Sequence, residues 1–287
     1  MRAMLRRIKS AYTVLRYPLW APPGHYYSPL ADKADVSRAI SQIDTNEEPI
    51  AIELNGTDQR GLAELLAQHW SEVPTVPDPQ WRYNPHNLWF GLADAAVYYS
   101  ILCHFRPNRV VEVGSGFSSA IALDAAERCL PDLKLTFIEP DPRRLLGVLK
   151  KSDEPRCKLL KSPVQDVPLG VYDELSSGDI VFIDSTHVSK PGSDVNWLLF
   201  EVLPRLRPGV HVHFHDLFWP FEYPKEWILE RRGWTEAYMV RAFLSYNKTF
   251  KIELFTSWLW GVAPELVKKA LPAAIDAQPG SLWIRKC

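Results

Sequence analysis

The chain has 287 residues, of which 46% are hydrophobic and 23% are charged, and its formal net charge is -1. This length fits one α/β domain with an added segment, and the apolar share is enough for a sizeable core. A net charge near zero argues against a nucleic acid or an anionic membrane surface as the main partner. No stretch reaches the ~18 apolar residues that a membrane-spanning helix needs.

The four cysteines do not pair as C-x-x-C, which argues against a zinc ribbon. Cys103 and Cys129 lie in apolar stretches and are interpreted as small core residues. We therefore expect a reducing compartment, the cytoplasm.

Prolines interrupt residues 1–86 repeatedly, and only one helix is predicted there, over residues 61–70. The segment is nevertheless rich in aromatic side chains, which a disordered tail rarely is. We expect residues 1–86 to form an N-terminal extension that packs on a main domain of residues 87–287.

From residue 87 onward, strand and helix patterns alternate. The predicted strands are 109–113, 134–138, 157–160, 179–183 and 209–214, with closing strands at 250–255 and 282–285. The predicted helices are 92–105, 118–128, 142–150, 194–206 and 237–246. Strands separated mostly by helices predict a doubly wound parallel sheet, in which a ligand lies beyond the carboxyl ends of the strands.

The most informative stretch is residues 110–119, where a short β-branched run ends in Gly114-x-Gly116 and a helical pattern follows. Glycines allow a sharp turn and a close approach to a ligand, and the start of a helix presents unpaired N–H groups. This layout predicts a nucleotide-like ligand. A dinucleotide site would need a third glycine, at the position where this chain has Ser119.

Three acidic residues accompany the first three predicted strands. Glu112 precedes Gly114 by two residues, Glu139 ends the second strand, and Asp166 follows the third. Glu139 suits a vicinal ribose diol, because one carboxylate can accept two hydroxyl hydrogens. Each acid also has a structural alternative: Glu112 bonded to its own turn, Glu139 as an exposed charge, and Asp166 as a cap or turn residue.

With this turn and these acids in order, the chain resembles the class I S-adenosylmethionine-dependent methyltransferases. More narrowly, it resembles a bacterial, mostly uncharacterised group close to small-molecule and sugar O-methyltransferases. The shared motifs are Gly-His-Tyr-Tyr-Ser-Pro, Glu-Val-Gly-Ser-Gly-Phe-Ser-Ser, Phe-Ile-Asp-Ser-Thr-His-Val and His-Phe-His-Asp. The resemblance implies a Rossmann-like seven-stranded sheet and S-adenosylmethionine as the cofactor.

The resemblance also assigns residues to the cofactor. It implies that the Gly-x-Gly turn holds the methionine part, that Glu139 binds the ribose, and that Asp166 with Gln165 meets the adenine amino group. The full set predicted in this way is Glu112, Gly114, Ser115, Gly116, Ser118, Glu139, Gln165, Asp166 and Asp184.

A second group of polar residues follows the fourth and fifth predicted strands. Asp184 and His187 come after the fourth, and His215 and Asp216 end the fifth. Because these strands should be neighbours, the four side chains should converge on one cleft. A hydroxyl acceptor must lose its proton, and histidine suits that task with a free pKa near ~6.5. We predict His187 as the base, His215 as the second candidate, and Asp184 as a further catalytic residue.

A divalent metal ion bound at the same place is the alternative to a histidine base. In a related set of O-methyltransferases, an acid after the fourth strand and an acidic or amide pair after the fifth hold magnesium. Asp184 and Asp216 match that pattern, but His215 stands where the first of the pair would be. A metal at Asp184, His215 and Asp216 would therefore be softer, such as manganese or zinc. His211 and His213, in mid-strand, are expected to be core residues.

The predicted function is S-adenosylmethionine-dependent methyl transfer to a hydroxyl of a small molecule or sugar. The alternatives are an NAD(P)-dependent oxidoreductase on a related sheet and a nucleotide-binding protein that catalyses no reaction. The aromatic residues 217–227 are expected to form a lid over the cleft or an apolar interface patch. The sequence does not fix the oligomeric state, and a homo-oligomer is among the states it allows.

Overall fold

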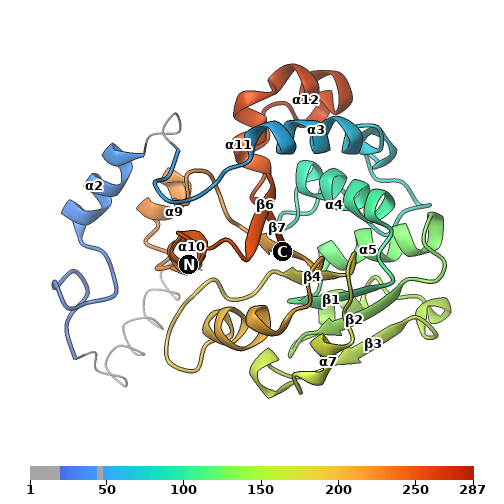
Figure 1. Ribbon diagram of the computed structural model, residues 1–287, viewed down its shortest axis with the longest axis horizontal. Coiled ribbons are helices and arrows are strands. Elements are labelled where there is room, and N and C mark those ends of the chain that lie inside the picture. Colours follow the sequence, from blue (N-terminus) through green and yellow to red (C-terminus); the bar gives the residue numbers. More distant parts are fainter. Residues whose placement is uncertain (1–19, 44–47) are drawn as a thin grey trace, which may run out of the picture. The chain divides into compact units, whose positions relative to one another are not determined.

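The computed structural model describes residues 20–43 and 48–287, and Figure 1 shows the path of the chain. Within these residues, no helix has both the length and the apolar character that crossing a membrane requires.

The contacts divide the chain into two compact units. The smaller unit comprises Met1–Ile43 and Pro224–Gly233, and its helices α2 and α9 pack together. Their bounds are Lys33–Gln42 for α2 and Lys225–Leu229 for α9. The larger unit comprises Asp44–Tyr223 and Trp234–Cys287 and contains the sheet.

The larger unit is built on one seven-stranded sheet in the order β3-β2-β1-β4-β5-β7-β6 (Figure 1). The first five strands pair in parallel, whereas β7 is antiparallel to both of its neighbours, β5 and β6. The strands are β1 (Arg109–Val113), β2 (Lys134–Ile138), β3 (Cys157–Leu160), β4 (Ile180–Ile183), β5 (His211–His215), β6 (Phe250–Phe255) and β7 (Ser281–Lys286). The predicted Rossmann-like seven-stranded sheet is thereby confirmed.

The strands lie within two residues of their predicted bounds, and β1, β2 and β3 match them. Every residue of β4 is buried, as expected for a parallel strand covered on both faces. The predicted strand at 209–214 is shifted because Gly209 has a φ of 87°. That is a turn conformation, so β5 starts only at His211.

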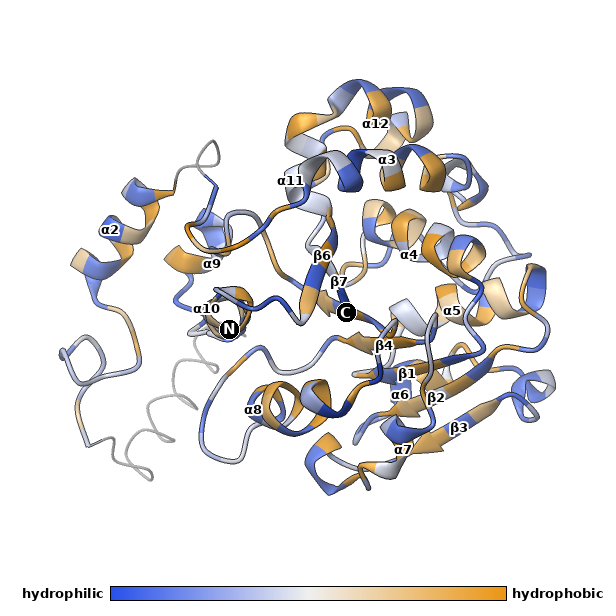
Figure 2. Cartoon of the chain, viewed as in Figure 1, coloured by the Kyte–Doolittle hydropathy of each residue, from blue (hydrophilic) through white to orange (hydrophobic). Residues whose placement is uncertain are grey.

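Helices cover both faces of the sheet. Helices α4 and α5 lie on one face, while α7 and α8 lie on the other (Figure 2). The helices of this unit are α3 (Gly56–Leu66), α4 (Leu92–Phe105), α5 (Phe117–Arg128), α6 (Arg143–Leu146), α7 (Gly170–Asp173), α8 (Asp194–Trp197), α10 (Glu236–Leu244), α11 (Thr256–Val262) and α12 (Pro264–Ala270).

Three predicted helices differ from those observed. The helix expected at 61–70 is α3, which begins five residues earlier, and the one expected at 142–150 is reduced to the single turn of α6. The helix expected at 194–206 is α8 followed by a π turn and a 3₁₀ turn. Pro204 lies in that last turn, where it has no N–H to continue α-helical bonding. Ser193 caps α8, accepting the N–H of Asn196 at 3.2 Å.

One buried cluster joins the sheet to segments far apart in the chain. It includes apolar side chains of α3, α4 and α5 and of the C-terminal helices α11 and α12. Trp70 and Trp260, for example, have ring centroids 5.3 Å apart. Part of the predicted extension thus packs within the larger unit, while the proposed domain boundary at residue 86 stays a prediction.

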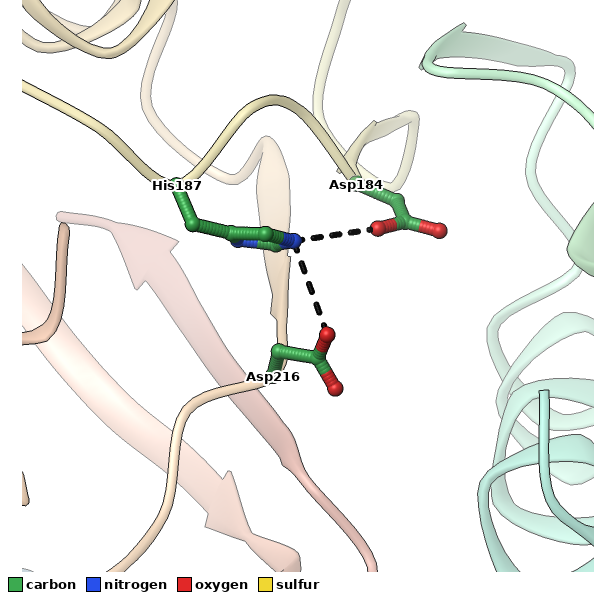
Figure 3. A group of neighbouring side chains, drawn as sticks. All are labelled: Asp184, His187 and Asp216. Carbon is green, nitrogen blue, oxygen red and sulfur yellow. Dashed lines mark ion pairs between the residues drawn. The ribbon is translucent and has the colours of Figure 1, made fainter. Parts of the chain in front are cut away.

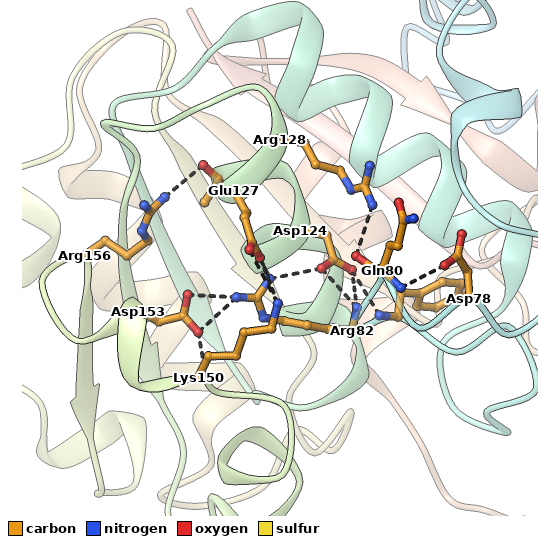
Figure 4. Close-up of polar contacts among 11 residues, drawn as sticks. Asp78, Gln80, Arg82, Asp124, Glu127, Arg128, Lys150, Asp153 and Arg156 are labelled. Carbon is orange, nitrogen blue, oxygen red and sulfur yellow. Dashed lines mark hydrogen bonds and ion pairs between the residues drawn. The ribbon is translucent and has the colours of Figure 1, made fainter.

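A buried arginine ties the segment before α4 to α5 and to the turn after α6 (Figure 4). The Arg82 side chain is only 3% exposed and donates to Asp124 at 3.1 Å and to Asp153 at 3.0 Å. It also pairs with Glu127, which Lys150 contacts at 3.1 Å. We call these five residues the Arg82 cluster, which fastens this segment to the sheet layer.

Candidate active site

The turn between β1 and α5 depends on two glycines in different ways. Gly114 has a φ of 82°, and a Cβ there would lie 1.7 Å from the carbonyl oxygen of Asp184. Its N–H donates to the carbonyl of Ile138 at 3.0 Å. Gly114 is therefore required where the ends of β1, β2 and β4 meet. Gly116 has extended backbone, and its Cβ would make only an ordinary contact with Arg144, 3.5 Å away.

Glu112 lies beneath this turn and is 1% exposed. One carboxylate oxygen accepts the hydroxyls of Ser118 and Ser119, both at 2.7 Å, and the other has no partner among the described residues. Burial raises its pKa to about 8, although the two serine hydrogen bonds oppose that shift. Ser119 also accepts the N–H of Gly116 at 2.9 Å. Glu112 thus braces the turn from below and is not among the cavity-lining residues.

A cavity of about 340 Å³ opens where β1, β4 and β5 end. Its lining joins the Gly-x-Gly turn to the polar residues that follow β4 and β5. The predicted site residues that line it are Gly114, Ser115, Gly116, Ser118, Glu139, Asp184, His187, His215 and Asp216.

Glu139 is fixed at the end of β2 by two backbone donors. It accepts the N–H of Ser115 at 3.1 Å with one oxygen and the N–H of Asp141 at 2.8 Å with the other. It also lines a second cavity of about 340 Å³, which shares Gly114 and Asp184 with the first. The carboxylate therefore stands between the two cavities.

The second cavity contains one of the two residues expected near an adenine group. Gln165 lines it and donates to the carbonyl of Gly192 at 2.8 Å. Asp166 is exposed, lies in a 3₁₀ turn, and lines neither of these cavities. Its position agrees with the alternative interpretation as a turn residue. Lys190 lines the same cavity.

The residues after β4 and β5 converge around one imidazole (Figure 3). Nε2 of His187 lies 3.5 Å from a carboxylate oxygen of Asp184 and 3.5 Å from one of Asp216. One ligand atom from each of the three lies within 4.8 Å of the others. His187 and Asp216 both have positive φ, 61° and 57°, an uncommon conformation that tends to occur at functional sites.

A fourth residue, absent from the predicted site, completes this group. Nδ1 of His187 lies 2.7 Å from a carboxylate oxygen of Glu236, the first residue of α10, which is 1% exposed. We call Asp184, His187, Asp216 and Glu236 the His187 cluster. No local signal marks Glu236, because it lies 49 positions from its partner.

The carboxylates around His187 decide its protonation. Burial alone would lower the pKa of the imidazole, but hydrogen bonds with Asp184 and Glu236 hold that pKa well above its usual value. The raised pKa favours the protonated form of this imidazole. The role of His187 as general base stays a prediction.

His215 lines the same cavity. Its Nε2 lies 3.7 Å from a carboxylate oxygen of Asp216, and its Nδ1 is buried without a partner in the described part of the chain. Burial opposes protonation of His215, but Asp216 and Asp184 raise its pKa. Burial also opposes ionisation of Asp184, but the charge of His215 and the bond to His187 hold its pKa below the usual value.

The other two histidines of β5 lie in the core. His211 is bonded to Glu253 at 2.6 Å, and His213 is fully buried with its ring stacked 3.9 Å from that of Phe182. The start of the predicted lid, Leu217–Tyr223, is largely buried, and Phe221 packs its ring 5.1 Å from that of Phe255. This part of 217–227 supports the sheet.

Arg144 and Trp89 are among the cavity-lining residues that were not predicted. The guanidinium of Arg144, from α6, lies 4.3 Å over the ring of Trp89, and both side chains line the first cavity. In the sequence, Arg144 stands beside Arg143 within a predicted helix, so nothing distinguishes the arginine that faces the cavity.

The fold and the cavity indicate a class of protein, which is a nucleotide-cofactor enzyme on a Rossmann-like sheet. Comparisons with known proteins agree with this class. A family model described as a methyltransferase domain matches residues 111–217, which run from β1 past the end of β5. An uncharacterised protein of Archaeoglobus fulgidus is 34% identical over 169 residues, which cover 55% of this chain and 75% of that protein.

Solved structures to which the chain is similar at low sequence identity include two O-methyltransferases. A putative O-methyltransferase from Klebsiella pneumoniae is 13% identical with a TM-score of 0.46, covering 88% of this chain and 96% of that one. The O-methyltransferase TomG from Streptomyces achromogenes is 14% identical with a TM-score of 0.46, covering 82% and 91%.

The chain belongs to the class I S-adenosylmethionine-dependent methyltransferases, as the sequence resemblance implied. The family's reaction is methyl transfer from that cofactor, and the dinucleotide oxidoreductase is not favoured.

Proposed function

We propose that this protein transfers a methyl group from S-adenosylmethionine to a hydroxyl of a small, sugar-like molecule in the reducing cytoplasm. One observation carries the proposal: the Gly-x-Gly turn, Glu139 and the His187 cluster meet at one cavity of about 340 Å³. Methyl transfer requires these groups to lie close together, because the methyl donor and the acceptor must be held near each other and in line.

The cavity walls fit the parts of the cofactor. Glu139 has the two-oxygen carboxylate that a ribose diol needs, and it is already oriented by two N–H groups. The second cavity, with Gln165, offers room for the adenine. Arg144 supplies a cation for the carboxylate of the methionine part. When bound, the cofactor supplies the electrophilic methyl group.

The His187 cluster fits a divalent cation. Two carboxylates and one imidazole converge, and the other imidazole nitrogen meets the buried carboxylate of Glu236. Metal-binding histidines are usually oriented by such a carboxylate. We therefore propose Asp184, His187 and Asp216 as the ligands, with His187 in place of the predicted His215. A cation there would orient the acceptor hydroxyl and lower its pKa.

With His187 bound to the cation, His215 is left to receive the proton, because a cation held by Asp184 and Asp216 would also offset the two carboxylates that raise the pKa of its imidazole. It lines the same cavity, and one of its ring nitrogens has no partner among the side chains that the structure describes. In this proposal Asp216 orients the His215 ring, whose Nε2 lies 3.7 Å from the carboxylate. Asp184 remains ionised between the two histidines, as its lowered pKa requires.

The decisive experiment combines binding and turnover. S-Adenosylmethionine should bind the purified chain, and NAD should not, in equilibrium titrations. With pooled small metabolites, the protein should then form S-adenosylhomocysteine, and one metabolite should gain the mass of a methyl group. Binding without turnover across hydroxyl-rich pools would support the alternative of a non-catalytic nucleotide-binding protein.

Chelation tests the metal separately. Activity should fall after chelation and return with manganese or zinc, while the His187→Gln variant should bind less metal. Full activity of the metal-free protein would end the metal proposal and leave methyl transfer intact.

A further inference from the structure

Two thiols lie against each other on the face of the sheet that carries α4 and α5. Cys103 is in the last turn of α4, and Cys129 is the residue that caps the carboxyl end of α5. Their sulfur atoms are 2.7 Å apart, and both residues are partly exposed. A disulfide bond is about 2.05 Å long, so the two sulfurs already lie close to bonding distance.

We propose that Cys103 and Cys129 form a reversible intramolecular disulfide when the protein meets a small-molecule disulfide. Neither residue touches the cofactor cavity, and the inference does not depend on the proposed methyl transfer. It revises the interpretation of both cysteines as small core residues.

The surroundings of the pair make the two thiols unequal. Arg106 donates to the carbonyl of Cys129 at 3.1 Å, which places a cation beside that residue. The hydrogen bond from Cys103 and the charge of Arg106 lower the pKa of the Cys129 thiol, whereas that hydrogen bond and burial raise the pKa of Cys103. A lowered pKa supplies the thiolate that starts exchange.

The exchange balances with one oxidant molecule. The Cys129 thiolate attacks a sulfur of the small disulfide, forms a mixed disulfide, and releases one small thiolate. Cys103 then loses its proton and attacks the sulfur of Cys129, which breaks the mixed disulfide and releases the second thiolate. The protein loses two protons and two electrons, and the small disulfide is reduced to two thiols.

The bond would close a loop that contains β1, the Gly-x-Gly turn and α5. It would join the carboxyl ends of α4 and α5, which already pack together. Cross-linking reduces the conformational freedom of the unfolded chain, so the oxidised protein should unfold at a temperature several degrees higher.

The test uses the full chain with the other two thiols removed, as C157S/C287S. After treatment with oxidised glutathione, denaturation and alkylation with N-ethylmaleimide, intact mass should show the loss of two hydrogens and no adduct. The same variant kept reduced should carry two adducts. Two adducts after oxidation, or a chain that retains glutathione, would overturn the proposal.

A second experiment on the unaltered chain tests the same linkage without depending on the folding of a variant. Peptide mapping after the same oxidation should find Cys103 joined to Cys129, with Cys157 and Cys287 outside that linkage. A linkage that instead pairs either thiol with Cys157 or Cys287 contradicts the proposal. C129S should lose the linked peptide, whereas C157S should keep it.

Discussion

The Arg82 cluster and the His187 cluster both contain buried charged groups beside the same sheet, but these groups differ in what surrounds them. Around Arg82, the buried carboxylates of Asp124 and Asp153 and the half-exposed carboxylate of Glu127 face one guanidinium (Figure 4). Around His187, three carboxylates face one imidazole, and Asp184, His187 and Asp216 line a cavity (Figure 3).

The difference separates a structural arrangement from a chemical one. A group of buried opposite charges holds segments together, because removing one partner leaves the others buried and uncompensated. A group of acids around an imidazole that lines a cavity is suited to bind a cation or to move a proton. Four substitutions test this distinction, in order of decreasing effect.

Arg82→Ala should lower the free energy of unfolding by about 3–5 kcal/mol, because Asp124 and Asp153 would stay buried without a cation. Urea unfolding measures the loss. Arg143→Ala is the matched control, since Arg143 pairs with Asp141 at the surface and its removal should leave stability unchanged. Equal effects of the two variants would remove the structural role of the Arg82 cluster.

Glu112 is buried like both clusters but hydrogen-bonds only to serine hydroxyls. Burial raises its pKa from 4.5 to about 8, so the folded chain holds a proton that the unfolded chain releases. Stability should therefore fall by about 2–4 kcal/mol as pH rises from about 5 to about 8. Glu112→Gln should remove that part of the slope in urea unfolding, and identical slopes would contradict the buried protonated acid.

Asp184→Asn should reduce methyl transfer roughly 100-fold, about 2.7 kcal/mol of transition-state stabilisation. Its urea midpoint should change far less than that of Arg82→Ala, because the His187 cluster borders a cavity. Steady-state kinetics and unfolding of one preparation give both numbers. A large loss of stability with retained turnover would place the His187 cluster among the structural groups.

Glu139→Ala should weaken S-adenosylmethionine binding by about 1–3 kcal/mol, the usual cost of losing a charged hydrogen-bond partner. Calorimetric titration measures the change, with Asp141→Ala as the neighbouring control at the surface. If affinity is the same in both variants, Glu139 has no part in holding the ribose.

The sequence predicted the sheet well, because its signals are local. Short stretches rich in apolar residues, followed by Gly-x-Gly, Glu139 and Asp184, mark where β1, β2 and β4 stop. It predicted the convergence of Asp184, His187, His215 and Asp216 for the same reason, since neighbouring parallel strands end at one edge.

What the sequence could not predict depends on contacts between distant residues. The pKa of His187 is raised by Asp184 and by Glu236, which arrives from α10. One oxygen of Glu112 has no partner among the described residues because it is buried in three dimensions. The predicted ends of helices were wrong where one residue changed the helical winding, as Pro204 does after α8. Position 114 requires glycine because the backbone of Asp184 lies against it. No periodic pattern in the sequence reveals that contact.

The placement of β7 has a consequence for how the molecule is made. β7 follows β6 in the chain but inserts between β6 and β5, and Ser281 pairs with His215. During synthesis, the edge of β5 presents unpaired backbone groups until β7 has been made and pairs with it. A chain whose synthesis stops before residue 281 therefore has an incomplete sheet with an exposed edge, so newly made chains should need protection from aggregation at that stage.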